Sequence, residues 1–268
     1  MGSFLTPVML RTALEVGLIY AIVALSLFIS FSILNICDLS TDGCFTLGCA
    51  VGAVVTMAGH PLLAIPAAML AGVLSGAVTA LLQTKLGVPS ILAGIIVNTG
   101  LYTVNLGVMG FSSNVSIFGT DTLFSLWGKL FDGTVLGDWS RSILLLILVA
   151  LICAALNWFL KTRIGLSIRA TGDSMEMVRA SSIAPSFMIV VGLCCSNALT
   201  GLAGSLFASY NKSADINLGT GMVTIALAAL IIGETLFGKR RMPVRIVGVV
   251  IGSCLYRFMI SIALRLNA

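Results

Sequence analysis

Residues 161–184 read KTRIGLSIRATGDSMEMVRASSIA, and they separate the apolar runs RSILLLILVALICAALNWFL (141–160) and SFMIVVGLCCSNALTGLAGSLFAS (186–209). Each run has about the 20 residues that an α-helix needs to cross the hydrocarbon core of a bilayer. The stretch between them carries four basic and two acidic residues. This pattern predicts two membrane-spanning helices joined by a charged segment in water.

The composition of the whole chain is typical of an integral membrane protein. Of its 268 residues, 58% are hydrophobic and 9% are charged, and the mean hydropathy is +1.10. Soluble domains have about a quarter of their residues charged. We therefore expect an all-α, polytopic transmembrane bundle that forms a single domain over residues 1–268. The net charge of +5 lies at segment ends, which indicates topology and lipid contact and not nucleic-acid binding.

About eight membrane segments are predicted from the apolar runs. They cover residues 8–32, 44–59, 61–82, 89–109, 141–160, 186–209, 221–237 and 244–264. The second and seventh are short, which favours broken or re-entrant helices of the kind that line cavities in transporters. Whether 44–59 crosses fully, and therefore on which side the amino terminus lies, stays open. Glycine pairs at spacing four (Gly48/Gly52, Gly72/Gly76 and Gly248/Gly252) predict close helix packing within the chain.

The basic residues orient the bundle. They mark 161–184 and the segment around 239–245 as cytoplasmic, whereas the 110–140 and 210–220 loops are poor in Lys and Arg and face outside. This orientation alternates correctly over the third to eighth segments and places the carboxyl terminus outside.

The charged segment itself predicts a short amphipathic helix at about 174–183. Asp173 and Glu176 form a pattern like a capping box at its start, and Pro185 follows its end. Such a helix either lies on lipid headgroups or contacts a partner, and the spacing alone does not choose between the two.

Three short motifs narrow this choice. They are Arg163-Ile-Gly165, Arg169-Ala-Thr-Gly172-Asp173 and Met177-Val-Arg179-Ala180-Ser-Ser-Ile183. Their order resembles the cytoplasmic loop of ABC-importer permeases of the branched-chain amino acid and ribose type, with Ser182 where that family has Gly. In the family this loop is a coupling helix seated in a groove of the ATP-binding subunit. The resemblance implies ATPase-coupling roles for Arg163, Gly165, Arg169, Ala170, Gly172, Asp173, Glu176, Met177, Arg179, Ala180 and Ile183.

A second resemblance lies upstream, in Asn35-Ile-Cys-Asp38-Leu-Ser-Thr-Asp42-Gly43. It looks like the broken second segment of the same family. Together with Ile232-Gly-Glu234 and Ile251-Gly-Ser-Cys-Leu-Tyr256-Arg257, it is most similar to the permeases that are paired with tryptophan/tyrosine-type binding lipoproteins. Related chains continue through one more apolar segment, so a final span after Ala268 stays an open question.

Polar residues inside apolar segments are candidates for a translocation pathway, because an unpaired amide in hydrocarbon is costly. Asn98, Tyr102 and Asn105 recur with Gly94 on one helical face, where a pathway and interhelical hydrogen bonds are equally good explanations. Packing is favoured for Asn197 and Thr200, and capping is at least as good an explanation for Asp38 and Asp42. The pathway set is Asn35, Asp38, Asp42, Asn98, Tyr102, Asn105, Asn197 and Thr200.

The stretch Gly233-Glu-Thr-Leu-Phe-Gly238-Lys239-Arg240 only superficially matches a P-loop, because Arg240 replaces the Ser or Thr that would hold Mg²⁺. We expect no catalytic residue, cofactor or metal in this chain, with ATP and Mg²⁺ bound by a partner subunit.

The predicted function is that of a permease subunit in a bacterial inner (cytoplasmic) membrane importer for a small solute such as an amino acid. Its expected partners are an ABC ATP-binding subunit, an extracytoplasmic solute-binding protein, a second permease copy (identical or similar) and membrane lipid. The alternative is a self-sufficient secondary transporter or channel, which would place ionisable residues deep in the spans and often shows an internal repeat. Only Glu15 and Glu234 stand out, both near segment ends, and no repeat is evident.

Overall fold

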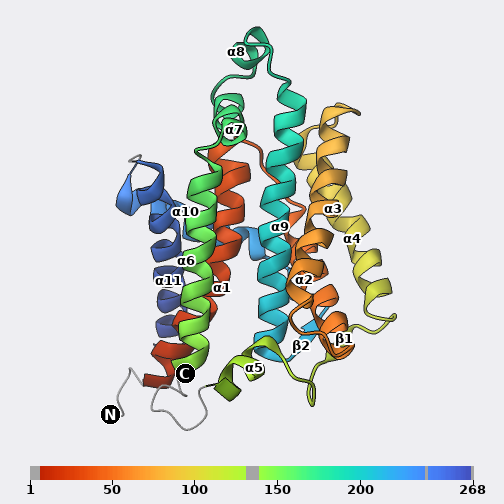
Figure 1. Cartoon of the computed structure of the whole chain (residues 1–268), viewed down its shortest axis with the longest axis vertical. Coiled ribbons are helices and arrows are strands. Elements are labelled where there is room, and N and C mark those ends of the chain that lie inside the picture. The colour runs from red at the N-terminus through yellow and green to blue at the C-terminus, as the bar shows by residue number, and fades with distance from the viewer. Residues whose placement is uncertain (1–6, 131–138, 239–240, 267–268) are drawn as a thin grey trace.

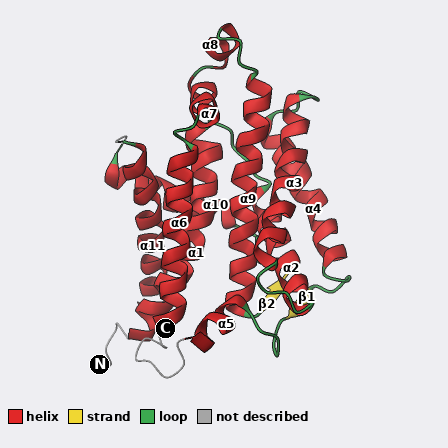
Figure 2. Cartoon of the chain, viewed as in Figure 1, coloured by secondary structure: helices red, strands yellow, loops and turns green. Residues whose placement is uncertain are grey.

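The computed structural model describes residues 7–130, 139–238 and 241–266, and these form a bundle of helices (Figures 1 and 2). The helices are α1 (Pro7–Leu27), continued by the π-helix η1 (Phe28–Ile33), α2 (Thr41–Met57), α3 (Ala64–Thr84), α4 (Ser90–Val108), α5 (Leu123–Leu130), α6 (Ser140–Phe159), α7 (Arg163–Asp173), α8 (Met175–Ala180), α9 (Pro185–Asn211), α10 (Met222–Phe237) and α11 (Met242–Leu266). Two three-residue strands, β1 (Asn114–Ser116) and β2 (Ser213–Asp215), pair antiparallel.

All eight predicted apolar segments are helices. Six of them, counting α1 and η1 as one, are long and apolar enough to cross a membrane, and α2 and α10 are shorter apolar helices. The described part of the chain is therefore a multi-pass membrane protein with six full-length spans and two short helices, rather than eight equal spans. Helices α7 and α8 lie at one end of the bundle, and β1, β2 and α5 lie at the other; we call these the upper and lower ends, as in Figure 1.

Both short helices follow a break in the chain. After η1, residues 34–40 leave the helical conformation and return into the bundle, where α2 begins at Thr41. After β2, residues 216–221 rise from the lower end, and α10 begins at Met222. Non-helical backbone is tolerated at this depth only where protein or a watery cavity satisfies its polar groups. The predicted break before the second segment is present, and a matching break precedes α10.

These breaks belong to an inverted repeat. Helices α1, α2 and α3 run up, down and up, while α9, α10 and α11 run down, up and down (Figure 1). The packing repeats as well, because α3 lies against α9 as α11 lies against α1. The expectation that the chain has no internal repeat is wrong. The lack of a repeat is therefore no longer an argument against a secondary transporter, since many of these are built from inverted repeats.

Close helix contacts hold the two units together. A Cβ added to Gly48 would lie 2.7 Å from Cα of Gly201, and one added to Gly72 would overlap the carbonyl of Asn197. Within the second unit, Gly252 of α11 similarly approaches the backbone of Gly233 in α10. The glycine pairs therefore pack helices within the chain, as predicted, because only a residue without a side chain permits this separation.

Buried hydroxyl groups join the two long antiparallel helices α1 and α9. The Ser26 hydroxyl lies 2.9 Å from that of Ser196 and 2.7 Å from that of Thr200, and all three residues are buried. In hydrocarbon these hydroxyls satisfy one another, so the contact fixes the register of α1 against α9.

Candidate functional site

A polar cavity of about 320 Å³ lies where the two short helices begin. Three elements build its wall: the first turn of α2, the middle of α4, and the rising segment 216–220 before α10. Its lining residues are Asp42, Gly43, Thr46, Asn98, Thr99, Tyr102, Asn105, Ile216, Asn217, Gly219 and Thr220. The structure thus brings together four of the predicted pathway residues, Asp42, Asn98, Tyr102 and Asn105.

Asp42 joins the two short helices at this cavity. It lies in the first turn of α2, but its carboxylate accepts hydrogen bonds from the backbone N–H groups of Gly221 (3.1 Å) and Val223 (2.8 Å) at the start of α10. A carboxylate here satisfies helix-terminal N–H groups and complements the positive end of the helix dipole. The capping role considered for Asp42 is present, although the helix that it caps is α10 and not its own.

Further hydrogen bonds attach the rising segment to α2. The Thr46 hydroxyl donates to the Asp42 carbonyl (3.2 Å) and accepts from the Gly219 amide (3.1 Å). Gly219 approaches so closely that an added Cβ would overlap the Asp42 carbonyl. The breaks before α2 and α10 are therefore tied to each other directly.

Helix α4 presents two asparagines to the start of α2. The Asn105 amide donates to the Gly43 carbonyl at 3.1 Å, and the Asn98 side-chain oxygen would lie 2.7 Å from a Cβ added to Gly43. Asn98 and Asn105 are seven residues apart, so they share a helical face with Tyr102 between them. The interhelical explanation is confirmed for Asn105, while the pathway role of the stripe stays a prediction, although both asparagines border the cavity.

The other predicted pathway residues lie apart from this cavity. Asn35 is at the upper end of the bundle, where its amide donates to the carbonyl of Gly172 in α7 at 2.8 Å. Asp38 is buried and accepts from Ser40 and from the Asn197 amide (2.8 Å). Thr200 belongs to the hydroxyl cluster between α1 and α9. These contacts are structural ones: they hold the stretch 34–40 and the helix α9 in place.

The charged segment forms two helices: the helix predicted at about 174–183 is present as the shorter α8, and α7, which was not predicted, precedes it. Asp173 is the last residue of α7, and the chain then turns at Ser174 (φ −159°, ψ 109°), whose hydroxyl accepts from the Met177 amide at 3.4 Å. Ser174 is therefore the N-cap of α8, and Asp173 and Glu176 do not form a capping box. Pro185 occupies the first turn of α9, a position where its missing N–H costs nothing.

Helices α7 and α8 divide the predicted coupling residues into two groups. The exposed ones are Arg163, Asp173, Glu176, Met177, Arg179 and Ala180, while Arg169, Ala170 and Ile183 are half-buried. Gly165 and Gly172 seat α7 on the bundle, because a Cβ on Gly165 would overlap the Phe159 carbonyl and one on Gly172 would overlap the Ile33 carbonyl. This pair of helices thus combines an exposed charged surface with a tight attachment to the end of η1.

Two glutamates within the spans are paired. Glu15 accepts from Arg11 (3.1 Å), Ser142 (2.6 Å) and Tyr210 (2.9 Å). Glu234 accepts from Arg245 (2.6 Å) and Ser32 (2.6 Å). Glu234 is thus salt-bridged to Arg245 of α11. Gly233 to Phe237, the front of the apparent P-loop, are part of α10.

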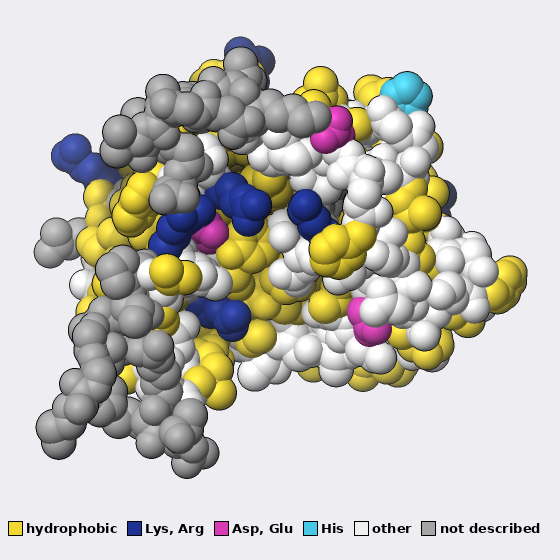
Figure 3. Space-filling view, turned by 90° about the horizontal axis from the view of Figure 1, so that it is seen from below, with side chains coloured by type: hydrophobic (Ala, Val, Ile, Leu, Met, Phe, Trp, Pro, Cys, Tyr) yellow, Lys and Arg dark blue, Asp and Glu magenta, His cyan; other side chains and the backbone are white. Residues whose placement is uncertain are grey.

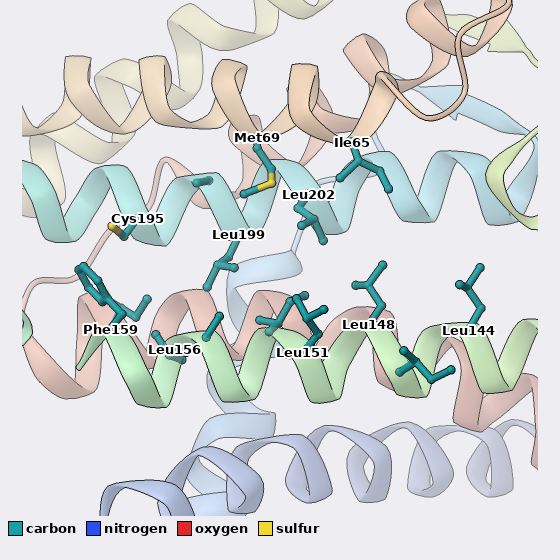
Figure 4. Close-up of a pocket in the computed structure, with 15 residues that line it drawn as sticks. Ile65, Met69, Leu144, Leu148, Leu151, Leu156, Phe159, Cys195, Leu199 and Leu202 are labelled. Atoms are coloured by element: carbon teal, nitrogen blue, oxygen red, sulfur yellow. The ribbon is translucent and has the colours of Figure 1, made fainter. Parts of the chain in front are cut away.

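A larger cavity of about 600 Å³ lies between α6 and the pair α3 and α9. Figure 4 shows Leu144 and Leu148 from α6 pointing toward Met69, Leu199 and Leu202 on the opposite wall. All of its lining residues are apolar. In a membrane protein such a groove matches the hydrocarbon of the lipid, and it offers a polar solute no hydrogen bond. The smaller, polar cavity is therefore the candidate functional site.

The predicted pathway set missed seven lining residues: Gly43, Thr46, Thr99, Ile216, Asn217, Gly219 and Thr220. A signal was available in Asn217-Leu-Gly-Thr-Gly221, a polar, glycine-rich stretch directly before a short apolar helix. It corresponds to Asp38-Leu-Ser-Thr-Asp42-Gly43 before the other short helix, and short interrupted segments in corresponding places point to a transporter's binding site.

The chain resembles known transport proteins over nearly its whole length. The profile of the family described as "Branched-chain amino acid transport system / permease component" matches residues 9–266. The tyrosine transport system permease protein of Clostridioides difficile is 34% identical over 252 residues, which cover 94% of this chain and 81% of that protein. The uncharacterized protein RP368 of Rickettsia prowazekii is 34% identical over 85% of this chain and 78% of its own. The ribose import permease protein RbsC of Escherichia coli K12 is 30% identical over 83% of this chain and 67% of its own. No solved structure matches the chain significantly.

Proposed function

This chain belongs to the permease family of branched-chain amino acid transport systems, and we propose that it is the membrane-spanning subunit of an ATP-driven importer for a small solute. The observation that carries the proposal is the direct attachment of α7, the first of the two charged helices, to the broken stretch that leads to the polar cavity. A solute-binding protein would deliver the solute at the lower end, and a separate ATPase would act at the upper end.

The attachment gives a short mechanical path. Gly172 of α7 packs against Ile33 and Leu34, and its carbonyl accepts the Asn35 amide. Seven residues further along, Asp42 lines the cavity and caps α10. A displacement of α7 would therefore move the stretch 34–40 and, through Asp42, both short helices. Rigid-body movements of packed elements of this kind switch transporters between outward and inward access.

The exposed side of α8 is suited to a protein partner. Glu176 and Arg179 are exposed together with Met177, which is 62% exposed although it is apolar. An exposed apolar side chain among charged ones is typical of a docking surface. The expected occupant is the ATP-binding subunit.

The lower end offers a basic surface. Figure 3 shows Lys and Arg side chains gathered on this face. Arg11 and Arg141 lie near Tyr210, and Arg141 and Lys212 line a small pocket with it. Such a surface would attract an acidic face of an external binding protein and raise its association rate. A second permease copy would complete the pathway, because the cavity's Thr99 and Tyr102 are exposed in the single chain.

Reconstitution tests the proposal. The chain, purified with its associated subunits, should carry labelled L-tyrosine or D-ribose into liposomes only when ATP and the binding protein are supplied on the correct sides. The same chain without the ATPase should be inactive. Uptake by the chain alone, driven by an ion gradient, would refute the proposal and establish a secondary transporter.

A further inference from the structure

The apolar groove between α6 and the pair α3 and α9 has a shape that selects its occupant. Its volume is about 600 Å³, and all of its lining residues are apolar. Figure 4 shows the groove following α6 from Leu144 to Phe159, with Leu199 and Leu202 of α9 on the opposite wall. Fifteen residues of α-helix span about 22 Å. The groove is therefore long and narrow.

These dimensions favour a lipid acyl chain over a further helix. An α-helix with its side chains is about 10 Å wide, so over the same length it would need roughly 1,700 Å³. The groove offers much less than that. An acyl chain is a single file of methylene groups that makes no hydrogen bonds, which suits the apolar lining. One leaflet holds about 15 Å of hydrocarbon, so a chain that enters at one end of the bundle fits within the groove.

A basic pocket lies at the lower end of the same two helices. Arg141 of α6 and Lys212, directly after α9, line it together with Ser209. Arg141 is on the groove-lining face of α6, because Leu144 follows it at helical spacing. Ser209 is on the groove-lining face of α9, seven residues after Leu202. The groove and the pocket thus follow one another along one line, which we call the α6–α9 seam.

Two features place the pocket at the level of lipid headgroups. Helix α5 contacts both α6 and α9 and contributes to the pocket wall. It is short and its apolar residues gather on one face, as in helices that lie in the membrane interface. Trp139, the exposed residue before α6, is of a type that is enriched at the same level. The basic side chains of the pocket therefore lie where lipid phosphates lie.

The described charges at this pocket favour an anion. Glu15 lies beside it, because it accepts the hydroxyl of the pocket-lining Tyr210, and Arg11 pairs with it. The second carboxylate is that of Asp121, which accepts a hydroxyl of α5. Set against Arg11, Arg141 and Lys212, the two carboxylates leave one positive charge. A guanidinium and an ammonium that line one pocket suit a phosphate group.

We propose that a glycerophospholipid with a net negative headgroup binds along the α6–α9 seam, with its phosphate at Arg141 and Lys212 and an acyl chain in the groove. Basic pockets between membrane helices bind anionic headgroups in this way. The lipid would fill the space beside α6, which leads through residues 160–162 into α7. The site is separate from the polar cavity, so this proposal goes beyond the proposed function. A protein partner at the lower end would then meet Arg11 and the other basic side chains seen in Figure 3.

The headgroup contact is tested by native mass spectrometry of the purified chain in detergent. Dioleoylphosphatidylglycerol and dioleoylphosphatidylcholine carry the same acyl chains, and only the first has a net negative headgroup. The first should bind at least fivefold more tightly. Arg141→Gln should reduce this preference to less than twofold, and Lys212→Gln should do the same if Arg141→Gln does not fold. Lys161→Gln is the matched control, because it removes an exposed positive charge at the other end of α6 and should keep the preference.

The groove contact is tested with a pair of neighbouring alanines on α6. Ala155 lines the groove and Ala154 does not, and both are exposed. Ala155→Trp should weaken the binding of both lipids at least fivefold, because the indole takes the place of the acyl chain. Ala154→Trp should stay within twofold of the native chain. Inorganic phosphate in excess should not displace phosphatidylglycerol, since it lacks the acyl chain.

Three results would overturn the lipid site: equal affinity of the native chain for the two lipids, equal effects of Ala154→Trp and Ala155→Trp, or displacement by inorganic phosphate. Loss of the preference in Lys161→Gln and not in Arg141→Gln would contradict the placement of the headgroup. If Arg141→Gln bound both lipids normally but no longer recovered an external binding protein, these cations would serve a protein partner instead. The chain is measured without ATP or an ATPase, so a failed uptake assay leaves the outcome unchanged.

Discussion

Single glycines decide how closely the charged segment can sit on the bundle. Gly172 has no room for a side chain, since a Cβ there would meet the backbone of Ile33 and Leu34. The same position also supplies the carbonyl that binds Asn35. Gly172 is therefore both a packing and a hydrogen-bonding contact between α7 and the stretch that leads to the cavity.

Gly172→Val should uncouple the two ends of the molecule. The added side chain must displace α7 from η1, and overpacking of this kind costs about 1–3 kcal/mol. We expect ATP hydrolysis by the associated subunit to continue while solute uptake falls at least tenfold. The measurement is the ratio of uptake to hydrolysis in proteoliposomes.

Gly100→Ala is the matched control, because nothing lies within 4 Å of an added Cβ in α4. It should leave uptake unchanged and raise the free energy of unfolding by about 0.5–1 kcal/mol. If Gly172→Val kept the native ratio of solute uptake to ATP hydrolysis, the attachment of α7 to η1 would not be needed to couple the two.

The cavity residues that lie on one helix could be predicted from the sequence, whereas the contacts between distant elements could not. Asn98, Tyr102 and Asn105 share a helical face, so their spacing alone brings them together. Asp42 reaches α10 only because two distant breaks meet, and nothing in its neighbours specifies that contact. Asn197 and Thr200 are as polar as the cavity residues, but their partners Asp38 and Ser26 come from elements that periodicity does not place.

Asn98→Leu should reduce uptake more than it reduces the amount of folded protein. Asn98 borders the cavity, and its replacement removes a polar group from the pathway while adding an apolar side chain of similar size. We expect at least a fivefold loss of uptake per molecule, with gel-filtration yield within twofold of the native chain. A large fall in yield with normal uptake per molecule would assign Asn98 a purely structural role.

At the scale of elements, the apolar segments were predictable because lipid requires long, uninterrupted apolar helices. The register of α8 was not, since both Asp173 and Ser174 are good N-caps and the choice depends on how α7 is seated. The inverted repeat also escaped prediction. It is a relation of direction and packing between α1–α3 and α9–α11, and their sequences do not resemble each other clearly.

One ion pair links α10 and α11 at the upper end, in addition to their close glycine packing. Arg245 contacts both Glu234 and Ser32, and its guanidinium lies over the Phe28 ring at 5.0 Å. Arg245→Met should destabilise the fold by about 1–3 kcal/mol, because it leaves the Glu234 carboxylate without its counter-charge in a partly buried site. A thermal-unfolding series in detergent measures this.

Arg257→Met is the matched control. The Arg257 guanidinium lies over the Tyr20 ring at 5.3 Å, and the described salt bridges do not pair Arg257 with a carboxylate. The substitution should cost about 0.5–1 kcal/mol. Equal losses in the two variants would show that the Glu234 pair contributes no more than the stacking does.

At the scale of the whole molecule, the two ends differ in kind. The upper end carries the exposed helices α7 and α8, and the lower end carries the β1–β2 pair, α5 and a basic surface (Figures 1 and 3). The polar cavity lies between them, where the two halves of the repeat meet. An assembly with a different partner at each end accounts for this difference between the two ends. A self-sufficient transporter would not need two different ends.

The most direct test of this account is whether an ATP-hydrolysing subunit binds α8. Met177→Arg places a charge on the exposed apolar side chain of α8, and Leu86→Arg does the same for the turn after α3, where Leu86 is 70% exposed. The native chain and Leu86→Arg should copurify with an ATPase from the native host in equal amounts, whereas Met177→Arg should lose it at least tenfold while remaining folded. Equal recovery of the ATPase with Met177→Arg, or no ATPase with the native chain, would contradict the account.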